Sequence, residues 1–188
     1  MRKLRTSFAY NISQPEESTW IHPSETELVK DLRASGLDLY SIDILTNTSE
    51  SYTEAIPVLI KHLYLMKDRL FLDGILRALT VKEARGIAFE PIYEMYIKDK
   101  DTKDHGAKYA MANALQYLAE KKDMPRIIEL ALDLNNGPTR FAFVDRIASS
   151  AGSKNIVDIK NVLSKLSNDV NKDIASRAQK ALKRKKFL

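Results

Sequence analysis

Three prolines recur at a constant interval of 34 residues in this chain of 188 residues, at Pro57, Pro91 and Pro125. Each proline opens an apolar stretch with helical spacing, and proline is favoured in the first helical turn, where its missing N–H costs no hydrogen bond. A period of this length indicates tandem units that are each too small to bury their own apolar face and that share a core with their neighbours. The sequence therefore predicts an all-α stack of repeated units.

A second periodicity, carried by small and apolar residues, supports the first. Four of these residues follow one another at intervals of 36, 33 and 34: Ala78, Ala114, Ile147 and Ala181. Small side chains let neighbouring helices approach closely, which stacked helix pairs require. We expect these positions to face the core from the second helix of each pair, and we expect Asp145 and Gln179 to interrupt the packing side of the last two pairs.

Apolar spacing and end signals divide the chain into four helix pairs after a weaker leading pair at 25–46. The four predicted pairs are 54–65 with 68–82, 89–97 with 103–119, 125–134 with 138–149, and 155–166 with 172–185. Gly36 predicts a helix stop, and Ser51-x-x-Glu54 has the spacing of a capping box. The side chains expected to cap other helix starts are those of Ser24, Ser153 and Asn171.

The segment 1–24 precedes these pairs and shows no helical period, although it contains several aromatic residues and the chain's single tryptophan, Trp20. We expect it to be an extended N-terminal arm, with one domain at 25–188. An aromatic-rich arm either covers an open end of the stack, because terminal repeats need protection, or docks onto a second copy of the chain to form a homodimer.

Several chemistries lack the residues they need. The chain has no cysteine, which excludes disulfides, thiolate metal sites and cysteine nucleophiles. His22, His62 and His105 are too far apart for a local metal motif, and we expect His62, on the flank of a helix, and His105, in a turn, to be surface residues. There is no Gly-rich phosphate loop and no Gly-x-Ser-x-Gly elbow. These patterns predict no metal and no cofactor, and they favour a non-enzymatic protein.

No apolar segment reaches the length of a membrane span, and no apolar signal region follows the first basic residues, so we expect a cytoplasmic protein without membrane contact. Its net charge of +5 is uneven: residues 1–60 carry five Lys/Arg against nine Asp/Glu, and residues 61–188 carry 25 against 16. The basic excess either attracts a polyanion or is ordinary solvated helix surface. The same alternatives apply to the cluster Arg77, Lys82 and Arg85 and to the tail 180–188.

The proline-opened first helix and the Ala-Leu-bearing second helix resemble HEAT repeats, particularly the short bacterial HEAT-like and armadillo-like kind. The likeness covers about residues 51–182 and is strongest in Ala107-Lys108-Tyr109-Ala110-Met111-Ala112-Asn113-Ala114-Leu115. It weakens elsewhere, because Leu72 and Phe141 stand where the family pattern has a basic residue. The resemblance implies a right-handed α-α superhelix, a solenoid of about four to five helix pairs.

In such a superhelix the second helices line the inner, concave side, and each pair presents polar residues there. The candidate binding residues implied in this chain are Asp73, Arg77, Lys108, Tyr109, Asn113, Arg146 and Lys180. For Arg77 and Arg146 a structural role is the alternative: each guanidinium pairs with a neighbouring carboxylate or caps a turn between repeats.

The family motif is specific for architecture and nearly silent about function. We predict a non-enzymatic interaction module that binds a protein or peptide on its concave face. The alternative is a nucleic-acid-binding protein, resembling in outline the HEAT-like alkylpurine DNA glycosylases, with Asp73, Arg77 and Tyr109 as the nearest analogue of their site. A role beside a chromophore lyase rests on the same family likeness. A continuous basic trough would favour nucleic acid, and a mixed, partly apolar groove a protein or peptide.

Overall fold

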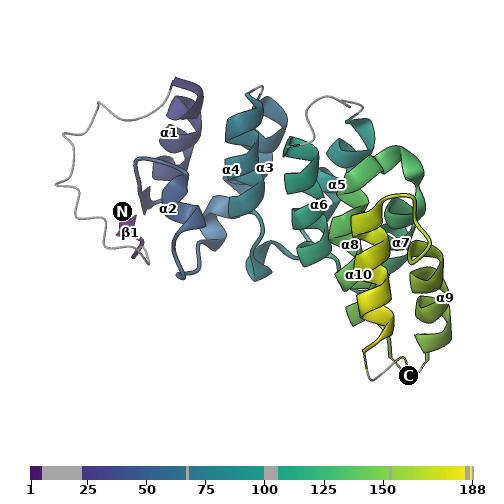
Figure 1. Ribbon diagram of the computed structural model, residues 1–188. Coiled ribbons are helices and arrows are strands. Elements are labelled where there is room, and N and C mark those ends of the chain that lie inside the picture. The colour runs from purple at the N-terminus through teal and green to yellow at the C-terminus, as the bar shows by residue number, and fades with distance from the viewer. Residues whose placement is uncertain (6–22, 67, 100–105, 153, 185–186, 188) are drawn as a thin grey trace. The chain divides into compact units, whose positions relative to one another are not determined.

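The computed structural model describes residues 1–5, 23–66, 68–99, 106–152, 154–184 and 187. Their regular secondary structure is almost entirely helical, so the prediction of an all-α protein is confirmed (Figure 1). They form two compact units, Met1–Pro91 and Ile92–Leu188. Most of the expected arm, with Trp20 and the proposed dimer contact, lies outside the described residues, as do His22, Ser153 and His105.

In its described residues, the first unit has four complete α-helices and three short 3₁₀ turns. The helices are α1 (Thr26–Ala34), α2 (Asp43–Thr46), α3 (Ile56–Leu65) and α4 (Arg69–Ala78), and the turns are η1 (Pro23–Glu25), η2 (Thr53–Ala55) and η3 (Lys82–Ala84). Helix α3 packs against both α1 and α4, and α2 packs against α4. Their apolar faces meet in a core that contains the fully buried Leu32, Leu59 and Leu63.

A short parallel pairing holds the first residues of the chain against this unit. Strand β1 (Arg2–Lys3) pairs with β2 (Leu37–Asp38), with Arg2 opposite Leu37, and Leu4 is buried. The turn between α1 and β2 uses Gly36 at φ +100°, and the Gly36 N–H donates to the Arg33 carbonyl at 3.0 Å. A positive φ favours glycine, so the helix stop predicted at Gly36 is confirmed.

The second unit contains most of α5 (Phe89–Lys98) and the remaining helices. These are α6 (Gly106–Leu118), α7 (Met124–Leu132), α8 (Phe143–Ser149), α9 (Ile156–Leu166) and α10 (Lys172–Leu182), with the 3₁₀ segments η4 (Lys121–Asp123) and η5 (Leu134–Ala142). Helices α7 and α8 pack against each other as one pair, and α9 and α10 pack against each other as the next. Helix α8 contacts both α6 and α10, so the second helices of consecutive pairs pack against one another.

Both sequence periodicities have a structural basis. Pro57, Pro91 and Pro125 all lie within the first three residues of their helices, α3, α5 and α7, where the backbone N–H has no intrahelical partner in any case. The small and apolar residues of the second periodicity, Ala78, Ala114, Ile147 and Ala181, have no solvent exposure. The predicted core face of the second helices is therefore confirmed.

Two predicted helices depart most from the structure. The helix expected at 68–82 ends at Ala78, and the one expected at 138–149 consists of η5 followed by α8. Within η5, Gly137 takes φ +56° and Pro138 follows it, which interrupts the regular α-helical backbone. The sequence predicts that Gly137 and Pro138 mark only the start of a helix. In the structure they lie inside the 3₁₀ segment η5, and the regular α-helix begins later, at Phe143.

The expected helix caps have mixed outcomes. The Asn171 side chain accepts hydrogen bonds from the N–H groups of Asp173 and Ile174 at the start of α10, as predicted. The capping box expected at Ser51 is absent, because Tyr52 precedes η2 and no side chain caps it. The Ser24 hydroxyl donates to Asp68 at 3.3 Å, and the residue at the N-cap position of α1 is Glu25, whose side chain makes no capping hydrogen bond.

No helix in the described part of the chain is both long enough and apolar enough to cross a bilayer.

Candidate functional site

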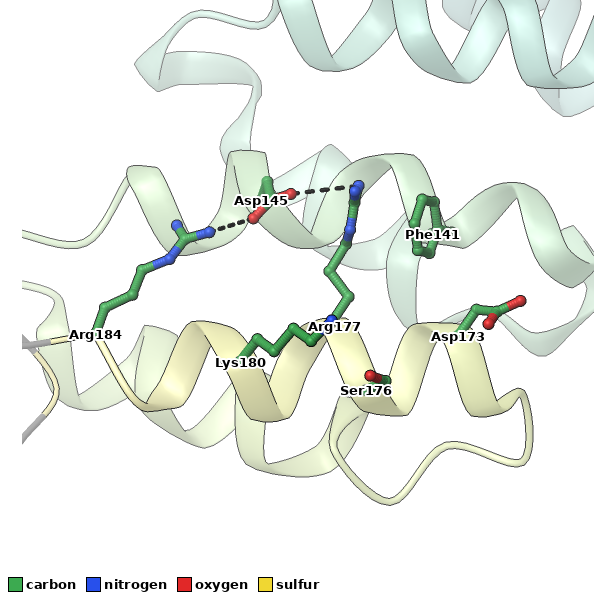
Figure 2. A pocket seen from close by; sticks show the side chains of 7 residues that line it. All are labelled: Phe141, Asp145, Asp173, Ser176, Arg177, Lys180 and Arg184. Carbon is green, nitrogen blue, oxygen red and sulfur yellow. Dashed lines mark hydrogen bonds and ion pairs between the residues drawn. The ribbon is translucent and has the colours of Figure 1, made fainter.

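Helix α10 carries a polar stripe along one side and a buried apolar face along the other. Ile174, Ala178 and Ala181 are buried against the rest of the unit. The residues on the opposite side project together: Asp173, Ser176, Arg177 and Lys180 follow helical spacing within α10, and Arg184 comes just after its end at Leu182. The alternation of apolar and polar residues in α10 therefore decides which of its side chains point away from the core, as Figure 2 shows for the polar ones.

This stripe forms one wall of an open groove with a volume of about 390 Å³. The other wall comes from the end of η5 and the start of α8, which contribute Phe141 and Asp145, four residues apart (Figure 2). Residues four apart lie on the same side of a helical segment, so the ring and the carboxylate both face α10. The groove lies wholly within the second unit.

One carboxylate in the groove is shared by two arginines. Asp145 Oδ2 lies 3.3 Å from Nη1 of Arg177, and Asp145 Oδ1 accepts a hydrogen bond from Nη2 of Arg184. The Arg177 guanidinium also lies over the Phe141 ring, 3.7 Å from its centroid. Arg177 is thus held between an anion and an aromatic face, a cation–π arrangement that fixes the direction of its guanidinium.

The other polar groups of the groove are uncommitted. Lys180 and Ser176 are exposed, and neither side chain forms a hydrogen bond or ion pair with any described residue. Asp173 is exposed in the first turn of α10, where the helix dipole favours a negative charge. Three cations and two carboxylates therefore line the groove, and Lys180 is the cation of the three that has no counter-ion among the residues that the structure describes.

A buried ion pair next to the groove connects its two walls. Arg140, which immediately precedes Phe141, donates from Nη1 and Nη2 to Asp169 at 2.5 and 3.0 Å. Asp169 lies in the turn before α10 and also accepts from the Asn171 N–H at 2.9 Å. The hydrogen bonds from Arg140 lower the pKa of the Asp169 carboxyl below its ordinary value, against the effect of burial. Asp169 therefore stays ionised and holds η5 against the start of α10.

Of the residues predicted to bind, only Lys180 lies in this groove. The Arg146 guanidinium donates to the Ala119 carbonyl just beyond the end of α6, so the capping alternative is the one that the structure has. Lys108 is buried, and its ammonium donates to the Asp99 carbonyl at 3.0 Å and lies 4.9 Å from the centroid of the Tyr96 ring. The sequence predicts that the Lys108 ammonium and the Arg146 guanidinium bind a partner. In the structure both groups instead form contacts within the fold.

The remaining predicted residues are more accessible. Asn113 is exposed and Tyr109 is half-buried, both on α6 in the second unit. Asp73 and Arg77 lie on α4 in the first unit, where Asp73 is half-buried and Arg77 is exposed. The Arg77 side chain makes no ion pair or hydrogen bond with the described residues, so the alternative of pairing with a neighbouring carboxylate is not seen there.

Sequence reasoning missed most of the groove. Arg177 was not considered, and Asp145 was expected on the packing side of α8, whereas it faces the groove. Gln179 is likewise exposed and donates to the Ser167 carbonyl at 3.0 Å, so it does not interrupt the packing of α10. The spacing of Arg177, Lys180 and Arg184 on one helix face was the available signal. The ion pairs that Arg177 and Arg184 form with Asp145 gave no signal in the sequence, because they join segments more than 30 residues apart.

The basic tail is partly packed against the second unit. Phe187 is buried, and its carbonyl accepts a hydrogen bond from the Lys160 ammonium at 2.8 Å. Within the tail, Lys180 and Arg184 line the groove and Lys183 is exposed. The tail therefore contributes two cations to the groove, and the Phe187 carbonyl binds it to Lys160 on α9.

His62 does not lie on the surface as expected. It is 5% exposed, and its Nε2 lies 2.8 Å from Asp31 Oδ2, which also accepts from the Lys61 ammonium at 2.7 Å. The hydrogen bonds from Lys61 and from His62 lower the pKa of the Asp31 carboxyl to about 2. This cluster joins α1 to α3. No group of metal-binding side chains occurs among the described residues.

Comparisons with protein-family models, with curated proteins and with solved structures found no match to this chain.

Proposed function

We propose that this protein is a non-catalytic interaction module that binds a protein or peptide segment in the groove between α10 and the η5–α8 wall. The observation that carries the proposal is the mixed lining of the groove. An aromatic ring, a stacked guanidinium and a shared carboxylate lie beside an ammonium and a hydroxyl that have no partner in the described residues. Such a set offers both apolar contact and hydrogen bonding to an extended chain.

The size and composition of the groove support this proposal. Its volume of about 390 Å³ lies within the range of about 300–1,000 Å³ that is usual for ligand sites. Arginine and aromatic residues are enriched in protein interfaces, where they supply most of the binding energy. The pair of Arg177 and Phe141 offers one preformed contact of this kind, because each side chain already restrains the other.

We also propose that the helix pairs form a HEAT-like solenoid and that the groove belongs to its inner, second-helix side. The proposal is supported by the packing inside each unit. In the first unit α1 contacts α3 and α2 contacts α4, and in the second unit α8 contacts both α6 and α10. First helices meeting first helices, and second helices meeting second helices, are typical of stacked two-helix repeats. The groove lies between two consecutive second helices, α8 and α10.

The proposed function is tested by selecting peptides from a random displayed library on the full chain. Selected peptides are then titrated against the wild type and against Lys180→Ala, with Lys165→Ala as the matched control. Lys165 is an exposed lysine on α9 away from the groove. We expect Lys180→Ala and Phe141→Ala to weaken binding about 5-fold or more, the effect of losing a contact worth at least 1 kcal/mol, and Lys165→Ala to leave it unchanged.

The proposal fails if no peptide is selected, or if all three variants bind the selected peptides as the wild type does. Lys180 is exposed, so its replacement leaves the core intact, and a loss of binding cannot be attributed to unfolding. For Phe141→Ala, circular dichroism and thermal unfolding show whether the helices remain formed. A variant that unfolds is replaced by Phe141→Leu, which keeps an apolar side chain without the aromatic face.

A further inference from the structure

We infer that the segment bound in this groove is acidic, and that one of its carboxylates replaces Asp145 as the counter-ion of Arg177 and Arg184. This inference rests on the proposed function and names the chemistry of the partner. In the empty groove, Asp145 occupies the position of the ligand carboxylate and pairs with the same two guanidinium groups.

The groove has a net charge of +1, because three cations, Arg177, Lys180 and Arg184, lie with the two carboxylates of Asp145 and Asp173, and this excess favours an added anion. Arg177 and Arg184 share the single carboxylate of Asp145, so this group of three carries one excess positive charge. Lys180 adds a second cation three residues after Arg177 on the same face of α10, with no counter-ion among the described residues. Each arginine also keeps further N–H donors, since a guanidinium has five and each ion pair with Asp145 is made through one nitrogen.

The exposure of the ion pairs makes the exchange energetically easy. The side chains of Asp145, Arg177 and Arg184 are 39%, 37% and 44% exposed. Ion pairs exposed to this degree contribute little stability, because water solvates the separated charges nearly as well. Giving up Asp145 therefore costs the fold little, whereas the buried pair of Arg140 and Asp169, at 3% and 6%, stays in place and keeps the walls together.

The lining favours an acidic peptide over a nucleic acid strand. Binding of a single strand relies on successive aromatic faces and a continuous basic groove. This groove has one aromatic ring, and the Arg177 guanidinium already covers it. Its two carboxylates, Asp145 and Asp173, would meet a charge on every nucleotide. A peptide can place a single carboxylate beside Lys180 and a neutral residue beside Asp173.

The test compares each selected peptide with a matched peptide in which every Asp and Glu is replaced by Asn or Gln. Fluorescence anisotropy at low ionic strength measures both affinities for the full chain. We expect the acidic peptide to bind about tenfold more tightly, the effect of hydrogen bonds to a charged group, and its advantage to shrink as salt is added. Equal affinities for the two peptides, or selected peptides without acidic residues, would overturn the inference while leaving the proposed function standing.

Two variants that each remove one negative charge from the groove test whether the peptide carboxylate replaces Asp145 or is only attracted by the net positive charge. Asp145→Asn frees two guanidinium groups, and Asp173→Asn removes a carboxylate that has no cation partner in the described residues. We expect Asp145→Asn to raise the affinity for the acidic peptide about 3- to 5-fold and Asp173→Asn to raise it less. Weaker binding by Asp145→Asn, or equal gains in both variants, contradicts the exchange. Displacement of the acidic peptide by oligothymidylate at equal concentration would favour nucleic acid and likewise overturn the inference.

Discussion

Arg140 and Asp169 form a buried ion pair through two parallel contacts, with Nη1 2.5 Å from Oδ2 and Nη2 3.0 Å from Oδ1. The same guanidinium donates from Nε to the Gly137 carbonyl at 2.9 Å. Arg140 therefore closes the 3₁₀ segment on its own backbone and also fastens it to the turn that starts α10. Both walls of the groove depend on this one side chain.

Replacing Asp169 by Asn should destabilise the protein. Asparagine keeps the shape but leaves the Arg140 charge buried without a counter-ion, which costs about 3 kcal/mol in the free energy of unfolding. Urea denaturation followed by circular dichroism measures the difference. Asp158→Asn, an exposed aspartate in the first turn of α9, is the control and should cost less than about 1 kcal/mol. Similar losses in both variants would show that the pair is not the cause.

Tyr96→Phe should lower stability modestly at neutral pH. The Thr139 hydroxyl donates to the Asn136 carbonyl at 2.7 Å, so the Tyr96 hydroxyl, 2.7 Å from Thr139 Oγ1, is the donor between these two buried side chains. Loss of this hydrogen bond costs about 1 kcal/mol. Thr139→Val should cost more in thermal unfolding, because it removes both bonds and leaves the tyrosine hydroxyl unpaired.

Tyr96 should also make the wild type sensitive to alkali. Burial raises the pKa of Tyr96 from 10.0 to about 12, so the unfolded chain loses this proton first as pH rises. Stability is then lost between about pH 10 and pH 12, and the gap between the wild type and Tyr96→Phe should narrow over that range. Denaturant midpoints at a series of pH values test this, and a constant gap would contradict it.

Asp31 should contribute stability that acid removes. Its pKa falls from 3.8 to about 2 in the folded protein, so its contribution is fully present above pH 3.8 and is lost as pH falls from there towards 2. Asp31→Asn should therefore be less stable than the wild type at neutral pH, with the difference shrinking below pH 3.8. Asp43→Asn, an exposed aspartate on α2, should show no such trend.

Arg146→Ala and Arg77→Ala should differ in their effect on stability. The Arg146 guanidinium donates to the Ala119 carbonyl, and its replacement should cost about 1–2 kcal/mol in the free energy of unfolding. Arg77 is exposed, and Arg77→Ala should stay within about 0.5 kcal/mol of the wild type. Equal melting temperatures for the two variants would refute the structural role of Arg146.

The burial of His62 and Lys108 could not be predicted from the sequence. Both are polar residues on helices, so local pattern placed one on the surface and the other on a binding face. Both are buried, because each has a specific partner from another segment, for example Asp31 on α1 for His62 and the Asp99 carbonyl for Lys108. A buried polar group is tolerated when such a partner exists, and helical spacing carries no information about distant partners.

The sequence by itself determined the helical class, the helix pairs and the buried side of each second helix, because prolines in first turns and small residues at a period near 34 act through local backbone and packing preferences. It also predicted Lys180 as a polar residue presented by the last of the second helices. Only the tertiary structure decided that Phe141 and Asp145 face them, that Arg140 joins the two walls, and that Arg146 and Lys108 are used within the fold. These relations depend on which distant segments meet, and that is set by the sum of many weak packing contacts.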